Sequence, residues 1–169
     1  YYMEGSAIPV GRAMVYILGT RTPYTVVDAL PGADDLAIAM QLSNFWRDIW
    51  QDWVRGGRIY IPQEDLDRFG YSEADLAARR INQNLSDLME FEIERTEGYY
   101  RSARASIRML ADGHWGVICG LEVYRRIIVE IRRNRYDVFS RRAGAGTAQL
   151  ARLVMCSWVQ TRLPANSGA

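Results

Sequence analysis

The spacing of apolar residues predicts a chain built from helices. Apolar side chains recur every three or four residues through most of the sequence, which is the spacing of one face of an α-helix. We therefore expect an all-α fold. The expected helices cover residues 2–18, 34–54, 82–112, 115–142 and 149–162, and two further short helices are expected between residues 63 and 80.

Proline and glycine mark the expected ends and bends of these helices. Pro9 lies inside the first apolar pattern, where proline removes a hydrogen bond and predicts a kinked core helix. Pro31-Gly32 predicts a turn that ends the connection over residues 19–34. Asp34 and Asp35 would then begin the central helix, because acidic side chains suit its positive end. We favour this capping role over metal binding for the pair.

The central helix carries one polar stripe. Asn44, Asp48 and Asp52 are spaced four residues apart, and each step of four turns the helix by only about 40°. Gln41 extends the stripe by one turn. The other sides of the helix are almost entirely apolar or aromatic, which is typical of a buried helix.

Two carboxylates on a buried helix need compensation, because burying an unpaired charge is costly and like charges four residues apart repel. A divalent cation would resolve both problems, and Mg²⁺ takes one or two carboxylates together with water and substrate phosphates. Arg47, Arg55 and Arg58 lie in or just after the helix, and arginine suits phosphate. The stripe thus suggests a diphosphate held through Mg²⁺. The alternative is a solvated helix with an ordinary basic end.

Composition limits the classes of protein. A chain of 169 residues, half of them hydrophobic, can form one domain with a core, and a net charge of +1 indicates no nucleic-acid partner. Cys119 and Cys156 have no metal or redox spacing and are expected to be buried thiols of a cytoplasmic protein. No apolar run is long enough to predict a membrane-spanning helix. The start at Tyr1 rather than Met leads us to expect a fragment.

The stripe also matches a known motif. The pattern Q-L-x-N-x-x-R-D-x-x-x-D, followed by G-R-I-Y-x-P, resembles the second aspartate-rich motif of the squalene and phytoene synthases. The resemblance implies the helical bundle of the isoprenoid synthases. It covers residues 2–150, and we expect residues 1–163 to be the C-terminal part of one such domain. The first aspartate-rich motif of that family is not in this sequence, and residues 164–169 are expected to be a disordered tail.

Further residues fall on positions of the same family. Tyr2, Ala7, Val10 and Gly11 match a segment that lines the prenyl pocket, and Tyr124 matches an active-site aromatic position. The sequence motif S-A-x-P-V-G-R is most similar to that of the bacterial hopanoid branch of this family, the hydroxysqualene synthases. Residues 136–142 match a closing motif, which we interpret as structural.

The resemblance implies an enzyme of the prenyltransferase class. We expect Mg²⁺-dependent ionisation of farnesyl or presqualene diphosphate, giving squalene or hydroxysqualene for triterpenoid (hopanoid) biosynthesis. The alternatives are a phytoene-type synthase and a non-catalytic assembly protein of the same superfamily. Peripheral contact with a membrane is also expected, since the product is a lipid, and the sequence leaves the oligomeric state open. In this interpretation Asp48 and Asp52 bind Mg²⁺, Gln41 and Asn44 orient the ligand, Arg47 and Arg58 neutralise the diphosphate, and Phe45, Tyr124 and Tyr2 stabilise the carbocation.

Overall fold

A computed structural model describes residues 2–162, with the side chains of residues 160–162 left out of the description. The described chain is helical, with one isolated β-bridge between Thr20 and Leu110, so the predicted all-α fold is confirmed. The predicted tail lies outside the described residues. The elements in chain order are α1 (Ala7–Leu18), α2 (Val26–Gly56), α3 (Gln63–Phe69), α4 (Glu73–Ala77), α5 (Gln83–Ser106), the short 3-10 helix η1 (Ile107–Met109), α6 (His114–Arg133) and α7 (Thr147–Arg162).

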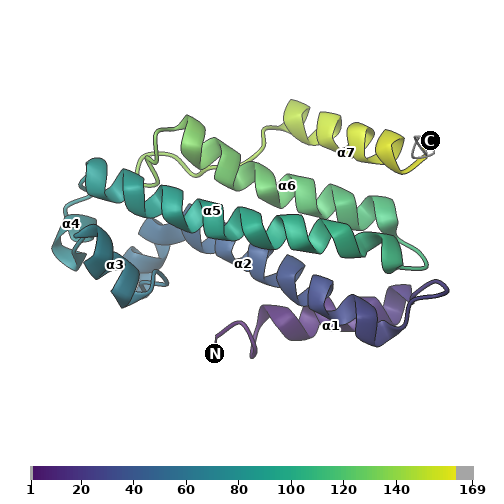
Figure 1. The fold of residues 1–169 in the computed structure, drawn as a ribbon. Coiled ribbons are helices and arrows are strands. Elements are labelled where there is room, and N and C mark those ends of the chain that lie inside the picture. Colours follow the sequence, from purple (N-terminus) through teal and green to yellow (C-terminus); the bar gives the residue numbers. More distant parts are fainter. Residues whose placement is uncertain (1, 163–169) are drawn as a thin grey trace, which may run out of the picture.

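Three long helices, α2, α5 and α6, run side by side through the middle of the molecule (Figure 1). Helix α1 packs against α2 at one edge and α7 packs against α6 at the other, while α3 and α4 lie at one end of the bundle. No helix in the described part of the chain is both long enough and apolar enough to cross a membrane. The core is made by side chains of the three long helices, including Trp46, Leu88, Met89, Ile93, Leu121, Ile128 and Ile131.

Two buried hydrogen bonds fix how α2 sits on α5. The indole Nε1 of Trp46 donates to the hydroxyl of Thr96 at 2.9 Å. One turn earlier, the Ser43 and Tyr100 hydroxyls lie 2.7 Å apart and share a hydrogen bond. Because each polar group finds a partner inside the core, neither pays the cost of an unsatisfied buried group. These contacts fix the rotation of α2 about its own axis, and so they also fix the direction in which its polar stripe faces.

The start of α2 differs from the prediction. The helix begins at Val26, after Thr25 and Asp28 form a reciprocal capping box, so Pro31-Gly32 lies inside the helix and does not form a turn. Gly32 is needed because α5 passes very close: a Cβ atom at this position would lie 2.1 Å from the Cβ of Ser106.

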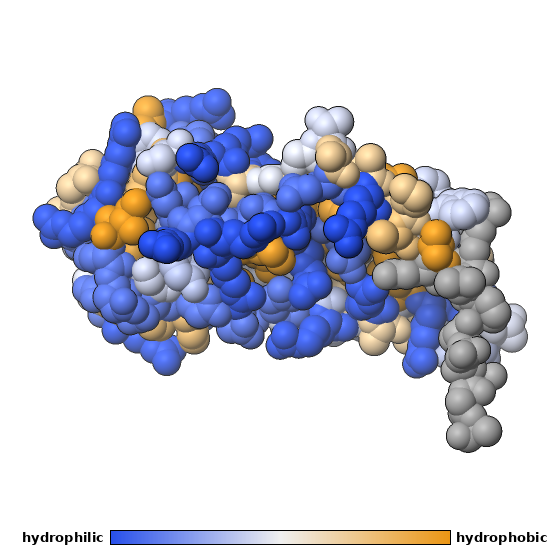
Figure 2. Space-filling model, turned by 90° about the horizontal axis from the view of Figure 1, so that it is seen from above, coloured by the Kyte–Doolittle hydropathy of each residue, from blue (hydrophilic) through white to orange (hydrophobic). Residues whose placement is uncertain are grey.

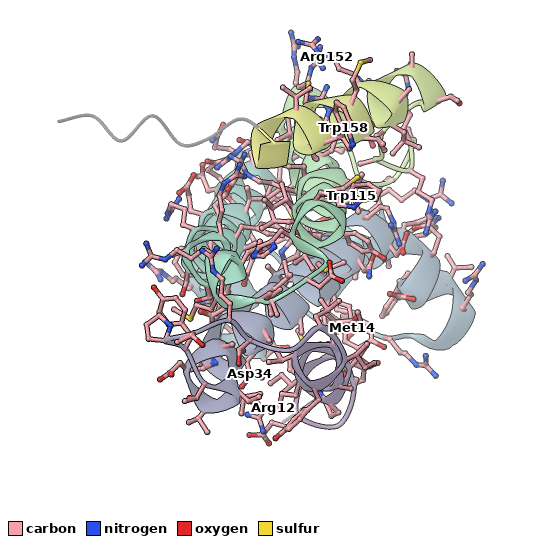
Figure 3. The ribbon with its side chains drawn as sticks, turned by 90° about the vertical axis from the view of Figure 1, so that its right-hand side faces the viewer. Arg12, Met14, Asp34, Trp115, Arg152 and Trp158 are labelled. Atoms are coloured by element: carbon pink, nitrogen blue, oxygen red, sulfur yellow. The ribbon has the colours of Figure 1, made fainter. Side chains whose placement is uncertain are left out.

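The predicted capping role of Asp34 and Asp35 is therefore wrong, because both lie well inside α2. Asp34 instead forms an ion pair with Arg12 of α1, with 2.6 Å between Nη2 and Oδ2 (Figure 3). Asp35 accepts a hydrogen bond from Ser102 of α5 at 2.5 Å. The two carboxylates tie α2 to its neighbours on both sides.

Helix α1 is shorter and less buried than predicted. It begins at Ala7, so Pro9 lies in the first turn, where its missing N–H costs no intrahelical hydrogen bond. Val15 is buried, but Ile17 is 74% exposed, so α1 is an edge helix rather than a core helix. Gly11 lets α1 approach α2 closely, since a Cβ there would lie 2.7 Å from the carbonyl oxygen of Ala33.

The other predicted helices are confirmed with shifted bounds; α7, for example, begins at Thr147, two residues before its predicted start. Helix α5 ends at Ser106 and continues only as η1, and α6 ends at Arg133 instead of Arg142. Arg135 and Tyr136 have φ angles of 53° and 60°, a left-handed conformation that stops the helix. The chain then continues without regular structure from residue 137 to residue 146.

Candidate active site

An apolar cavity of about 600 Å³ lies between α1, α2, α5 and α6. Its walls are mostly small and aliphatic side chains, such as Val10, Ala37 and Val117. The volume is typical of a site for a small organic ligand, and the lining suits a hydrocarbon. Six predicted site residues line the cavity: Ala7, Val10, Gly11, Gln41, Asn44 and Tyr124.

The polar stripe of α2 begins in this cavity and leaves it. Gln41 and Asn44 are part of the cavity wall, whereas Asp48 and Asp52 are not. The four residues lie on one face of a continuous helix, so the stripe leads from the apolar cavity to a charged region one and two turns further along α2. The amide groups thus stand between the apolar and the charged parts of the site.

Two arginines hold the carboxylate of Asp48. The Nε atom of Arg47 donates to Oδ1 at 2.9 Å, and a second bond joins its Nη2 to Oδ2. Arg142 donates to the same two oxygens at 2.9 and 3.1 Å. Partial burial would raise the pKa of Asp48, but the hydrogen bonds and charges of both arginines outweigh it and lower this pKa. Asp48 is therefore ionised at neutral pH.

Arg142 was missed by the sequence interpretation, which treated residues 136–142 as structural. It is separated from Asp48 by 94 positions along the chain. Residues 134–146, between α6 and α7, bring it back to α2, where Phe139 contacts Trp50 with ring centroids 5.9 Å apart. The only signal in the sequence was the arginine pair that closes the motif. The charged end of the site therefore includes at least two guanidinium groups next to Asp48.

The segment after α2 builds an aromatic cluster. Gly57 takes a left-handed conformation with φ of 61°, which ends α2 and reverses the chain. Tyr60 then stacks on Phe45 with ring centroids 3.9 Å apart and an interplanar angle of 3°. Tyr2 meets both rings edge-on, 5.6 Å from Phe45 and 5.4 Å from Tyr60.

The hydroxyl of Tyr2 is influenced by the charges of nearby residues. Its hydrogen bond with Tyr60 is the main cause that raises the pKa of Tyr2, and the charges of Arg58 and Asp52 also act on it. The structure thus brings Tyr2, Phe45, Asp52 and Arg58 into one neighbourhood. Tyr124 does not join the aromatic cluster; it lines the cavity from α6.

The donors on α2 fit a hard divalent cation in part. In the described residues, no group of three or more His, Cys, Asp or Glu side chains is arranged so that it could hold a metal ion. The stripe offers two carboxylates and an amide, and Mg²⁺ uses one or two carboxylates with water and phosphate as its other ligands. The Oε1 atom of Gln51, three residues after Asp48 on a neighbouring position of the helix, is buried without a hydrogen-bond partner. Its unused acceptor oxygen fits the same chemistry.

Comparison with known sequences identifies the group of proteins. The family model described as "Squalene/phytoene synthase" matches residues 1–149. The chain is 43% identical over 122 residues to 15-cis-phytoene synthase of Synechococcus elongatus, covering 72% of this chain and 39% of that protein. It is 30% identical over 170 residues to phytoene synthase 1, chloroplastic, of Arabidopsis thaliana, covering 99% of this chain and 39% of that protein. The chain thus spans about two fifths of the length of these curated relatives.

Solved structures agree in fold. A dehydrosqualene synthase in complex with a ligand superposes with a TM-score of 0.85 at 23% identity, covering 95% of this chain and 56% of that one. Squalene synthase HpnC from Alicyclobacillus acidocaldarius gives a TM-score of 0.68 at 28% identity, covering 80% and 50%. The predicted isoprenoid synthase fold is confirmed. On its sequence match and its fold, this chain belongs to the squalene/phytoene synthase family.

Proposed function

We propose that the intact protein joins two prenyl diphosphates head to head. In this proposal the chain supplies one wall of the prenyl pocket and one side of the diphosphate site. The observation that carries the proposal is the stripe on α2, which runs from Gln41 and Asn44 in the wall of an apolar cavity to Asp48 between two arginines. A prenyl diphosphate has the same arrangement, a hydrocarbon chain joined to a diphosphate head that carries about three negative charges.

The cavity would receive the hydrocarbon chain. Its lining is apolar along α1 and α6, and glycines such as Gly11, Gly116 and Gly120 keep it wide. Burying a prenyl chain there removes it from water, which supplies binding free energy in proportion to the apolar area. The walls also keep water away from the reacting carbon.

The charged end would receive the diphosphate. Arg47 and Arg142 donate hydrogen bonds to the carboxylate of Asp48. Arg58 lies near Asp52 and Tyr2. Guanidinium groups bind phosphate oxygens through paired hydrogen bonds, so they stabilise the charge that develops as the carbon–oxygen bond breaks. Mg²⁺, which we propose is held by Asp48 and Asp52, would add Lewis-acid stabilisation of the same leaving group when bound.

Aromatic faces would stabilise the carbocation that remains. Phe45, Tyr60 and Tyr2 form a stacked and edge-on cluster beside the charged residues, and Tyr124 lies in the cavity wall. The negative faces of aromatic rings attract cations without reacting with them. Aromatic rings are thus available to stabilise the carbocation both beside the diphosphate end and in the wall of the hydrocarbon cavity.

Two product classes have specific support. The curated relatives with 40–45% identity are phytoene synthases, which favours a phytoene-type reaction on geranylgeranyl diphosphate. The motif S-A-x-P-V-G-R and the 28% identity to squalene synthase HpnC favour a squalene or hydroxysqualene product from farnesyl diphosphate. We place the phytoene-type product first because those sequence matches are stronger.

Product analysis tests the function directly. The full-length product of the gene that encodes this chain is incubated with Mg²⁺, a nicotinamide hydride donor (NADPH) and either geranylgeranyl or farnesyl diphosphate, and the hydrocarbons are identified by mass spectrometry. We expect phytoene from the longer substrate. Squalene or hydroxysqualene from the shorter one would select the second product class. No product from either substrate would contradict the proposal and favour an assembly protein.

Arg142 offers a matched pair of variants. Arg142→Gln removes a guanidinium group that binds Asp48, whereas Arg141→Gln changes the adjacent arginine, which has no such bond to that carboxylate among the described contacts. We expect the first variant to lower turnover by at least about tenfold, as for the loss of one charge-stabilising donor, and the second to leave it nearly unchanged. Equal activity of the two variants would remove Arg142 from the site.

A further inference from the structure

The segment between α6 and α7 buries two apolar side chains. Residues 134–146 contain no helix or strand, and Figure 1 shows them at the end of the bundle where α2 ends and α5 begins. Most of the molecular surface seen from above is hydrophilic (Figure 2). Within the segment, however, Val138 is only 3% exposed and Phe139 is 9% exposed. An irregular segment normally lies on the surface, so these two side chains mark the place where it is attached to the bundle.

Phe139 is attached to Trp50 of α2. The two rings meet edge-on, with an interplanar angle of 77° and 5.9 Å between their centroids. Trp50 is itself held by Arg79, between α4 and α5, whose guanidinium carbon lies 3.9 Å from the centroid of the Trp50 ring. Edge-on aromatic pairs and cations over an aromatic ring are both favourable, so Trp50 offers Phe139 a fixed surface. We call the contact between Phe139 and Trp50 the anchor.

Asp137 fixes the turn on which Phe139 lies. Its Oδ1 atom accepts hydrogen bonds from the backbone N–H groups of Phe139 at 3.1 Å and Ser140 at 2.9 Å. Such a bond from an aspartate to the backbone two residues on holds a tight turn. Just before the turn, the hydroxyl of Tyr136 donates to Oε2 of Glu90 on α5 at 2.7 Å. The segment is therefore bound to α5 near its start and to α2 in its middle.

Three residues after Phe139, Arg142 reaches the charged end of the site. Its guanidinium group donates to both carboxylate oxygens of Asp48, but the side chain of Arg142 is 60% exposed. An exposed ion pair contributes little on its own, because ordering a long side chain costs entropy. Burying a phenylalanine side chain contributes more. The anchor, rather than the ion pair, is thus the contact that keeps Arg142 beside Asp48.

We propose that Phe139 is a positioning residue for diphosphate binding: anchored on Trp50, it holds the guanidinium group of Arg142 where the head of the substrate binds. This inference rests on the proposed function, in which Arg142 contacts the diphosphate. Restraining a donor before the ligand arrives reduces the entropy that binding would otherwise cost, so the affinity rises. Phe139 is not among the described residues that line the cavity, so it acts on the substrate through Arg142.

A double-mutant cycle tests whether Phe139 acts through Arg142. Phe139→Ala, Arg142→Gln and the double variant are made in the full-length gene product, and calorimetry measures their affinity for a non-hydrolysable prenyl diphosphate analogue with Mg²⁺. We expect Phe139→Ala to weaken binding by at least about fivefold. The double variant should bind within about twofold of Arg142→Gln, because the anchor then has no guanidinium group to position. Phe139→Leu, which keeps an apolar anchor, should bind within about twofold of the wild type.

Trypsin cleavage tests the anchor without any ligand. Trypsin cuts after arginine, so Arg141 and Arg142 give the segment two cleavage sites. We expect cleavage there to be at least about tenfold faster in Phe139→Ala than in the wild type, because loss of the anchor lets the segment open. Mass spectrometry of the fragments identifies the sites that are cut.

Phe91→Ala is the matched control. Phe91 of α5 forms a similar aromatic pair, with its ring centroid 5.3 Å from that of Phe69, and the guanidinium group of Arg68 lies over its ring. Thermal unfolding followed by circular dichroism checks that this variant and Phe139→Ala both fold. The control should bind the analogue and resist trypsin at Arg141 and Arg142 like the wild type. A prenyl alcohol, which has no diphosphate, should bind Phe139→Ala as well as it binds the wild type.

Three results would overturn the positioning role of Phe139. They are equal cleavage of the wild type and Phe139→Ala, unchanged analogue affinity in Phe139→Ala, and a loss of affinity from Phe139→Ala that is the same with and without Arg142. A wild type that binds no analogue, although its segment resists trypsin, would count against the proposed function. Because cleavage reports on the anchor without a ligand, the two failures are distinguishable.

Discussion

Replacing Glu92 by glutamine should make the stability of this protein less dependent on pH. Glu92 is fully buried on α5, and Asp65 of α3 is 4% exposed beside it. A single guanidinium group serves both carboxyl groups: Nη1 of Arg95 lies 3.1 Å from the Glu92 oxygens and 3.0 Å from Oδ2 of Asp65. One positive charge thus faces two acidic groups in the core.

Burial is the main cause that raises the pKa of Glu92 to about 7, and Asp65 adds to the shift while Arg95 opposes it. The ordinary value of 4.5 applies in the unfolded chain, so the native state binds this proton more tightly. The contribution of protonated Glu92 to the free energy of unfolding is complete below pH 4.5 and is lost as the pH rises through about 7. The shift corresponds to about 3 kcal/mol between these limits.

Glu92→Gln replaces the titrating carboxyl by a neutral group of the same shape. Urea unfolding of the wild type and the variant at pH 5, 6, 7 and 8 gives the difference in the free energy of unfolding. We expect this difference to change by about 2–3 kcal/mol in favour of the variant as the pH rises from 5 to 8. A difference that stays constant within about 0.5 kcal/mol would refute the reasoning.

Further substitutions test the helix contacts and the stripe. Asp48→Asn should abolish turnover of the intact protein and lower its free energy of unfolding by about 1 kcal/mol, because two guanidinium groups lose their carboxylate; product assays and urea unfolding measure both effects. Gly32→Ala should destabilise the fold by about 1–3 kcal/mol through its clash with Ser106, whereas Gly116→Ala, with no atom within 4 Å of the added Cβ, should be tolerated; their melting temperatures decide this. Trp46→Phe should cost about 1–2 kcal/mol in urea unfolding, since it leaves a buried hydroxyl without its donor.

The features that could be predicted are local in the sequence. The stripe of Gln41, Asn44, Asp48 and Asp52 follows from residue spacing within one helix, and such spacing has the same consequence in any helix. Helix α4 was predicted as one of two short helices between residues 63 and 80, and a local capping box between Ser72 and Asp75 fixes its start. The resemblance of the motif to the squalene and phytoene synthases was confirmed by the family match over residues 1–149.

The features that were missed depend on contacts between distant parts of the chain. Pro31-Gly32 has the composition of a turn, but the capping box at Thr25 and the close approach to Ser106 keep it helical. Arg142 reaches Asp48 only because α6 ends early, at a left-handed conformation that Arg135 and Tyr136 adopt without glycine. Neither residue type signals that conformation, so the sequence alone could not place this arginine in the site.

The most direct test of the central claim is binding of a non-hydrolysable farnesyl or geranylgeranyl diphosphate analogue, measured by calorimetry with and without Mg²⁺. It is carried out on this chain, on the full-length gene product and on the Asp48→Asn variant of each. The account predicts Mg²⁺-dependent binding in the full-length product that the variant weakens by at least about tenfold, and binding in this chain as well if the Asp48 and Asp52 side works as a half-site. Analogue binding that depends on neither Mg²⁺ nor Asp48 would contradict it.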